Sequence, residues 1–153
     1  MESFEALIDK LQNGTPSEKA DAASELGHLK DLRAISFLRR SLNDSDVSVR
    51  DNAAYALAEI GAKESVRDLI KLLDDESKMV RKSAAKGLGI LKSAESLEPL
   101  IKKIDDDSYL VRKSVIRSLI QIGGEKAKKA LKERLPKEDN PYIQNIIREF
   151  LRI

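Results

Sequence analysis

The sequence has no cysteine, no tryptophan and only one histidine in 153 residues. Without thiols, disulfides and thiolate metal sites are excluded, and nothing points to an oxidising compartment. A metal site built on imidazole and thiolate needs several such ligands, so His28 is better explained as a surface histidine. No serine or threonine has an evident base partner for nucleophilic catalysis. We therefore expect neither a metal nor a cofactor, and we do not expect an enzyme.

Long apolar runs are also missing. No uninterrupted run approaches the roughly 18 residues that a membrane span requires. The segment from Met1 to Glu5 lacks the basic start and apolar core of a secretory signal. We expect a cytoplasmic protein that does not act at a membrane. Charged residues make up 35% of the chain, but the net charge of +2 is too small to imply a nucleic-acid partner by itself.

What the sequence does have is a repeat. The Val-Arg pair at Arg50 recurs 31 positions later at Arg81 and again 31 positions later at Arg112, with no gap needed. A fixed period of this size is the signature of a repeat array, whose units bury their apolar faces against their neighbours.

Each unit predicts two amphipathic helices, which we call the A helix and the B helix. In the unit around 46–75, Asp46 is a suitable N-cap for the A helix and Gly61 a suitable residue after its end. The apolar positions of the A helix recur at helical spacing: Val49, Ala53, Ala54, Leu57 and Ile60. The B helix follows with its own stripe of Val66, Leu69, Ile70 and Leu73.

The segments from Asp46 to Arg50 and from Ala53 to Gly61, followed by Leu69 and Leu73, resemble HEAT-like repeats of the phycobilisome-lyase type. The resemblance covers nearly the whole chain and implies an all-α fold, a right-handed α-α superhelix of about ten helices in stacked antiparallel pairs. Such repeats serve adaptors, lyases and metal-dependent hydroxylases alike, so the resemblance does not decide the function.

The period divides the chain into one domain over 1–153. It begins with a half repeat at 1–14, which is a B helix. Four full repeats follow at 15–44, 45–75, 76–106 and 107–137, and an A helix at 138–153 closes the array. We expect this last helix to act as a cap, and its uncovered apolar edge is a candidate for self-association.

A column of cations stands at the start of the A helices, beside the acidic turns that end the preceding units. A guanidinium has five donors and can bind a carboxylate and turn carbonyls together. We interpret the column as a structural ladder that joins consecutive repeats: Lys19, Arg50, Arg81 and Arg112.

The polar side of the B helices varies from copy to copy, while the buried columns do not. In HEAT-like solenoids the B helices line the concave face, so the resemblance implies that these side chains project into a basic groove with apolar spots. The predicted partner-binding residues are Arg39, Arg40, Arg67, Ile70, Lys71, Ile101, Lys102, Lys129 and Lys132.

These residues favour a non-enzymatic scaffold that binds a protein or peptide with acidic and apolar features. Binding of a nucleic-acid backbone is an alternative, and the near-neutral net charge and lack of tryptophan argue against it. A lyase or chromophore-handling accessory role is suggested only by the resemblance. Gly87 and Gly89 fall inside an A helix with no strand before them, so they indicate tight packing and not a nucleotide-binding loop.

Overall fold

The computed structural model describes all 153 residues and consists of ten α-helices without any strand. The A helices of the sequence are α2 (Pro16–Leu29), α4 (Val47–Ile60), α6 (Lys78–Leu91), α8 (Tyr109–Ile122) and α10 (Pro141–Leu151). The B helices are α1 (Phe4–Asn13), α3 (Ile35–Ser41), α5 (Val66–Leu72), α7 (Leu97–Ile101) and α9 (Glu125–Arg134). Short 3₁₀ turns precede α3, α5 and α7 and follow α9, at Leu32–Ala34, Lys63–Ser65, Ala94–Ser96 and Leu135–Lys137.

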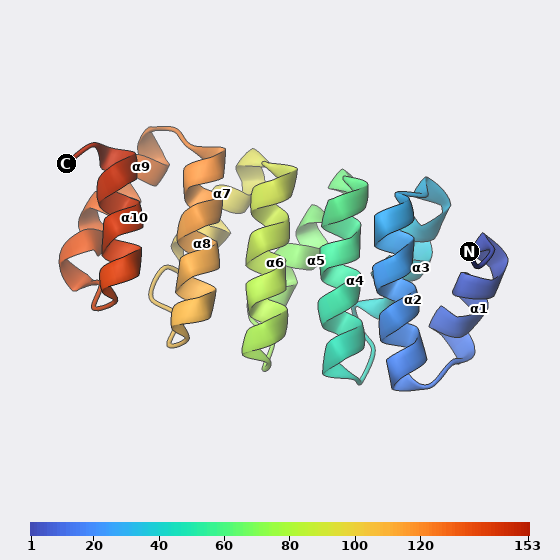
Figure 1. Ribbon diagram of the computed structural model, residues 1–153. Helices are drawn as coiled ribbons and strands as arrows, with labels where there is room; N and C mark the ends of the chain where they lie inside the picture. Colours follow the sequence, from blue (N-terminus) through green and yellow to red (C-terminus); the bar gives the residue numbers. More distant parts are fainter.

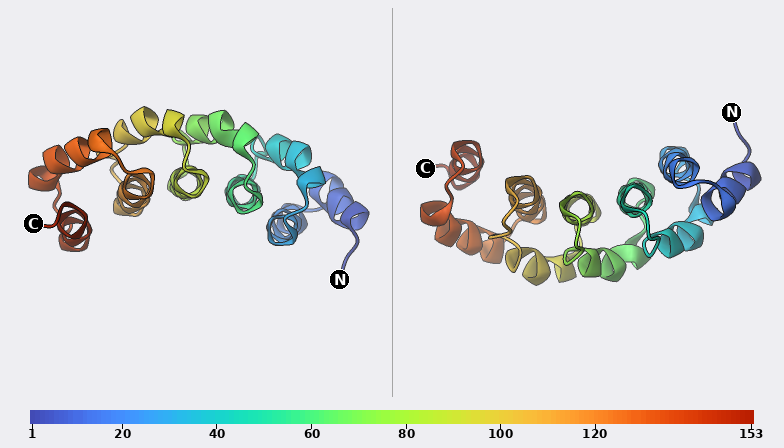
Figure 2. Two further views of the ribbon diagram at one scale, coloured as in Figure 1. Left: turned by 90° about the horizontal axis from the view of Figure 1, so that it is seen from above. Right: turned by 90° about the horizontal axis from the view of Figure 1, so that it is seen from below.

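The helices form two rows that follow one arc. The long A helices stand side by side in sequence order, and the N-terminus and C-terminus lie at opposite ends of the row (Figure 1). Seen along the A helices, the B helices form a second row behind them and run along the arc (Figure 2). The predicted all-α solenoid of stacked helix pairs is therefore confirmed.

Local sequence signals fix the ends of the A helices. At α2, the Thr15 hydroxyl accepts a hydrogen bond from the Glu18 amide, and the Glu18 carboxylate accepts one from the Thr15 amide. This is the capping box expected from the sequence, with Pro16 in the first turn. Asp46 caps α4, and Gly61 ends it with φ of +80°, a left-handed conformation that glycine adopts without a steric penalty.

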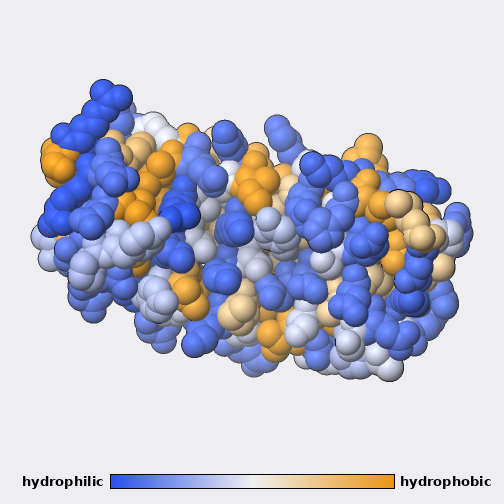
Figure 3. All heavy atoms as spheres, viewed as in Figure 1, coloured by the Kyte–Doolittle hydropathy of each residue, from blue (hydrophilic) through white to orange (hydrophobic).

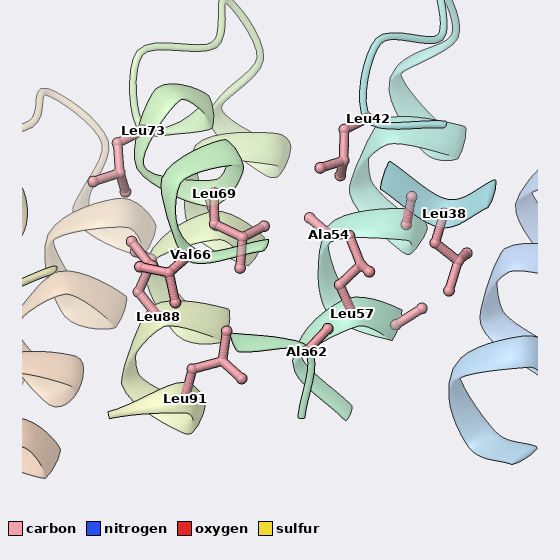
Figure 4. Close-up of a cluster of buried hydrophobic side chains, with 14 of the residues drawn as sticks. Leu38, Leu42, Ala54, Leu57, Ala62, Val66, Leu69, Leu73, Leu88 and Leu91 are labelled. Carbon is pink, nitrogen blue, oxygen red and sulfur yellow. The ribbon is translucent and has the colours of Figure 1, made fainter. Parts of the chain in front are cut away.

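The core is one continuous layer between the two rows. In the central repeats, Leu57 of α4, Leu69 of α5 and Leu88 of α6 are fully buried and converge between the rows (Figure 4). The leucine column of the A helices and that of the B helices thus meet in the same layer, repeat after repeat. Because each repeat buries its apolar stripe only with its neighbours, stability is shared along the array.

The A helices line the inner, concave side of the arc and the B helices the outer side (Figure 2). The expectation that the B helices line the groove was wrong. The reason lies in the small residues of the A helices. A Cβ on Gly27 would lie only 2.8 Å from the Ala56 Cα, and one on Gly87 3.2 Å from the Ala58 Cβ. Small residues at these contacts let neighbouring A helices pack closely. The row of A helices is therefore the shorter of the two rows, and the array curves toward it.

No helix combines the length and apolar character needed to span a bilayer. No group of three or more histidine or acidic side chains is placed to hold a metal ion.

Candidate protein-binding surface

The predicted partner-binding residues belong to the outer row of helices, not to the row that lines the groove. They belong to α3, α5, the end of α7 and α9: Arg39, Arg40, Arg67, Ile70, Lys71, Ile101, Lys102, Lys129 and Lys132. Some of them are engaged within the chain. Arg39 Nε donates to Asp68 Oδ2 at 2.7 Å, and Arg67 Nε lies 3.6 Å from Glu95 Oε2.

The apolar members of this set are only half exposed. Ile70 and Ile101 both pack against the core. A shallow cleft of about 400 Å³ between α7 and α9 includes Ile101 and Lys102, and Asp105 and Glu133 line it as well. The outer face is therefore of mixed charge. Its role in binding stays a prediction.

The ladder residues lie at one edge of the arc, where each A helix begins. Arg50 Nε and Nη2 donate to the Asp75 carboxylate at 3.0 and 3.1 Å, and its Nη1 donates to the Asp44 carbonyl at 2.9 Å. Arg81 repeats this pattern with the Asp106 carboxylate and the Asp75 carbonyl. Each guanidinium therefore joins the turn before its own helix to the turn one repeat later.

The two ends of the ladder differ from its middle. Lys19 Nζ makes a single contact, with Asp44 Oδ2 at 3.1 Å. Arg112 donates to the buried carboxylate of Glu138, which stands one residue beyond the position that the period specifies for an aspartate. Burial opposes ionisation of Glu138, but donors from Arg112, the Asn140 amide and Arg134 outweigh it, so the pKa of this carboxyl is lowered.

The inner face carries a second, independent set of cations. We call Lys82, Lys86, Lys113, Arg117 and Arg148 the inner basic surface; they project from α6, α8 and α10. Lys86, Arg117 and Arg148 are equivalent positions of three successive repeats, as are Lys82 and Lys113. None of the five takes part in an ion pair within the chain. The inner face is covered mainly by hydrophilic side chains, with separate apolar spots (Figure 3).

The inner basic surface contains no acidic neighbour on its own central helices. α6 and α8 have no aspartate or glutamate at all, and their only cations outside the inner surface are Lys78 and the ladder residues Arg81 and Arg112. Cations on the same and on neighbouring helices make the local electrostatic potential more positive when no acid compensates them. This part of the groove therefore carries positive charge that no acid of α6 or α8 compensates.

Tyrosines are interleaved with these cations. Lys86 Nζ lies 5.0 Å from the centre of the Tyr55 ring, and Arg117 Nη2 donates to the Tyr142 hydroxyl at 2.6 Å. Lys113 Nζ also lies 5.9 Å from the Tyr142 ring centre. A ring face next to a cation holds the side chain without neutralising its charge. Tyr142 is 55% exposed, so it also offers an apolar ring to a partner.

Sequence reasoning missed the inner basic surface because it assigned the groove to the other helix of each repeat. A signal was nevertheless present: two successive A helices without a single acid, and cations in register at Lys86, Arg117 and Arg148. The single histidine, His28, is exposed and lies 3.8 Å from Glu59, as expected for a surface residue. At the end of the array, Ile146 and Phe150 of α10 are half-buried against the core, and self-association there stays a prediction.

Comparison with known families identifies the repeat. The family model for HEAT repeats matches residues 4–77 and 66–152. The chain belongs to the HEAT-repeat family. A search of curated proteins found no match to this HEAT-repeat chain.

Solved structures show similar folds. The complex of CpcE and CpcF of phycocyanin lyase from Nostoc sp. PCC7120 includes a chain that superposes with a TM-score of 0.84 at 25% identity. The match covers 99% of this HEAT-repeat protein and 64% of that chain, so the protein spans less than two thirds of its length. A designed armadillo repeat protein in complex with the peptide (KR)4 matches with a TM-score of 0.71 at 23% identity, covering 95% of this chain and 79% of that one.

Proposed function

We propose that this HEAT-repeat protein is a non-enzymatic scaffold that binds an acidic segment of a partner protein along its concave face. The observation that carries the proposal is the inner basic surface, Lys82, Lys86, Lys113, Arg117 and Arg148, whose cations have no ion-pair partners. A solenoid that keeps unpaired cations in register along one face supplies repeated contacts for an extended anionic chain. The cations recur in three successive repeats and do not converge on one point, which suits binding better than catalysis.

The apolar part of the partner would meet the exposed spots of the same face. Tyr142 is 55% exposed and Ile90 of α6 is 39% exposed. Burial of such side chains supplies much of the affinity at an interface, while the cations steer and orient the partner. The partner segment would therefore combine carboxylates with a few apolar side chains.

The similar solved structures support a protein partner. One of them is a complex of two chains, CpcE with CpcF, and another holds the peptide (KR)4. The lyase-type role is the weaker candidate, because it depends on likeness to a chain of which this protein spans 64%.

Binding to a nucleic-acid backbone is the alternative that the same cations favour. The distinguishing quantity is the dependence of the affinity on salt. Each phosphate neutralised on duplex DNA adds nearly one unit to the slope of log K against log salt. An acidic peptide with apolar contacts retains more of its affinity as salt rises.

The experiment is fluorescence anisotropy with a labelled peptide of glutamates and interspersed leucines, repeated with a short DNA duplex. We expect the peptide to bind at moderate salt and the duplex to be released over the same range. A duplex that binds more tightly than the peptide at moderate salt would favour the nucleic-acid alternative. Failure of both probes to bind at low salt would overturn the proposal.

A further inference from the structure

The concave face is divided into two halves of opposite charge. The acidic half belongs to α2 and α4 and consists of Asp21, Asp51 and Glu59. Glu18 and Glu25 of α2 line, with Asp21, a separate cleft toward α1 that includes Lys10. The only lysine or arginine residues of these two helices, Lys19 and Arg50, are bound in the ladder at the edge. The basic half belongs to α6, α8 and α10. The sign of the charge therefore changes between α4 and α6.

The acidic half contains a cleft. A cleft of about 460 Å³ between α2 and α4 is lined by Asp21, Asp46 and Asp51, and Ser17, Ser48 and Asn52 add polar groups. Glu59 lies further along α4, where its side chain is 18% exposed and its Oε2 lies 3.8 Å from His28 Nε2. The cleft contains no lysine or arginine. It therefore suits a cationic side chain, just as the inner basic surface suits carboxylates.

The two halves meet without neutralising one another. Ser83 of α6 donates to Asp51 of α4, and Tyr55 of α4 holds Lys86 of α6 by its ring. Neutral groups thus stand at the boundary, and no ion pair of the concave face joins α4 to α6. The charges on the two sides therefore have no ion-pair partners across the boundary.

Resting on the function proposed above, we propose that the partner segment is bipolar. Its basic residues lie over α2 and α4, and its acidic residues lie over α6, α8 and α10. Neighbouring packed helices are about 8–10 Å apart, so the centres of the two halves, two and a half helix spacings apart, are separated by roughly 20–25 Å. An extended chain covers that distance with about six or seven residues. The order of charges in the segment then sets the direction in which it lies.

The occupant is an extended segment and not a second copy of this chain. Opposite charges on the two halves would also suit a copy turned face to face. Two concave faces, however, touch only at their rims and leave the charged centres apart (Figure 2). A single extended chain follows the floor of the groove and reaches both halves.

Three labelled peptides test the proposal on the full chain. The block peptide has a run of lysines, a short neutral spacer and a run of glutamates. The alternating peptide has the same composition with lysine and glutamate in turn, and the third peptide carries glutamates alone. We expect the block peptide to bind about tenfold more tightly than the alternating one, a difference of about 1.4 kcal/mol.

A variant with Asp21→Asn, Asp51→Asn and Glu59→Gln separates the two proposals. It should lose the preference for the block peptide and keep, or raise, its affinity for the all-glutamate peptide. Equal affinities of the block and alternating peptides for the unaltered protein would overturn bipolar recognition while leaving acidic-segment binding intact. If none of the three peptides binds, both proposals fail together. Circular dichroism of the variant confirms that it remains folded.

Discussion

Arg50 Nε of α4 lies 3.0 Å from Asp75 Oδ2, in the turn that follows α5, and both side chains are largely buried. The same guanidinium also binds the turn before its own helix, so one side chain ties together two turns that lie one repeat apart. Its removal would leave the Asp44 carbonyl without a donor and the Asp75 carboxylate with only the Ser77 amide.

The first prediction concerns this contact. Arg50→Met should lower the free energy of unfolding by about 2 kcal/mol or more, because a partly buried carboxylate loses its counter-ion. The control is Arg67→Met, which removes an ion pair whose arginine side chain is 86% exposed and should leave stability unchanged. Urea unfolding followed by circular dichroism measures both. Equal losses in the two variants would show that the ladder has no special role.

The second prediction concerns acid. The pKa values of Asp44, Asp106 and Glu138 are lowered in the folded chain: burial opposes ionisation, but hydrogen bonds from cations and backbone amides outweigh it. The unfolded chain therefore binds more protons than the folded one at low pH. The stabilisation is present above about pH 4, the usual range of carboxyl pKa values, and is lost as the pH falls through the folded values.

Glu138→Gln should therefore lower stability at neutral pH and flatten the loss of stability below about pH 5. Thermal unfolding at closely spaced pH values measures this effect. The matched control is Glu64→Gln, an exposed residue of the turn before α5, which should leave the pH profile unchanged. A profile for Glu138→Gln as steep as that of the unaltered protein would contradict the assignment.

The third prediction concerns two buried hydroxyls. Ser65 and Ser96 are fully buried and their Oγ atoms have no hydrogen-bond partner. The equivalent positions of the neighbouring repeats are Ala34 and Ala127, so alanine fits this column. Ser65→Ala and Ser96→Ala should each raise the free energy of unfolding by about 1 kcal/mol, since an unsatisfied buried polar group is removed.

The control for these variants is Ser118→Ala. The Ser118 hydroxyl is also buried, but it donates to the Ala85 carbonyl at 2.6 Å. Its loss should lower stability by about 1 kcal/mol. Denaturant midpoints rank the three variants, and destabilisation by Ser65→Ala would mean that its hydroxyl has a partner in solution.

The fourth prediction concerns the close packing that bends the array. Gly27→Ala should destabilise the protein by about 1–3 kcal/mol, because the new Cβ would lie 2.8 Å from the Ala56 Cα and the helices must separate. Alanine favours a helix more than glycine does by roughly 1 kcal/mol, so the expected loss of stability runs against intrinsic helix propensity. Ser24→Ala on the same helix, half-buried on the inner face, should change stability little. A more stable Gly27→Ala protein would show that the A row can relax.

The architecture was accessible from the sequence because repetition multiplies a weak signal. One amphipathic stretch is ambiguous, but Leu57, Leu88 and Leu119 at the same position in successive copies specify a shared buried layer. The helix caps could be predicted for a different reason. Asp46 and the Thr15–Glu18 pair act on backbone atoms a few residues away, so the local sequence is enough to identify them.

The side of the groove was not accessible in this way. Both helices of a repeat are amphipathic, and the pattern of apolar residues does not show in which row the neighbouring helices pack more closely. That depends on how closely neighbouring helices approach, and the decisive residues are small ones such as Gly27 and Ala56, which carry little hydrophobic signal. The charges of the groove were therefore assigned to Lys71 and Lys102 of the outer row instead of Lys86 and Arg117 of the inner row.

In the proposed function, the inner row of helices binds the acidic partner and the outer row does not. Two triple variants with equal charge change test it directly: Lys86→Glu, Lys113→Glu and Arg117→Glu on the inner face, and Lys71→Glu, Lys102→Glu and Lys132→Glu on the outer face. Affinity for the labelled glutamate–leucine peptide is measured at one salt concentration, with folding checked by circular dichroism. We predict that the inner variant loses at least tenfold in affinity and the outer variant less than twofold. A loss confined to the outer variant would contradict the account.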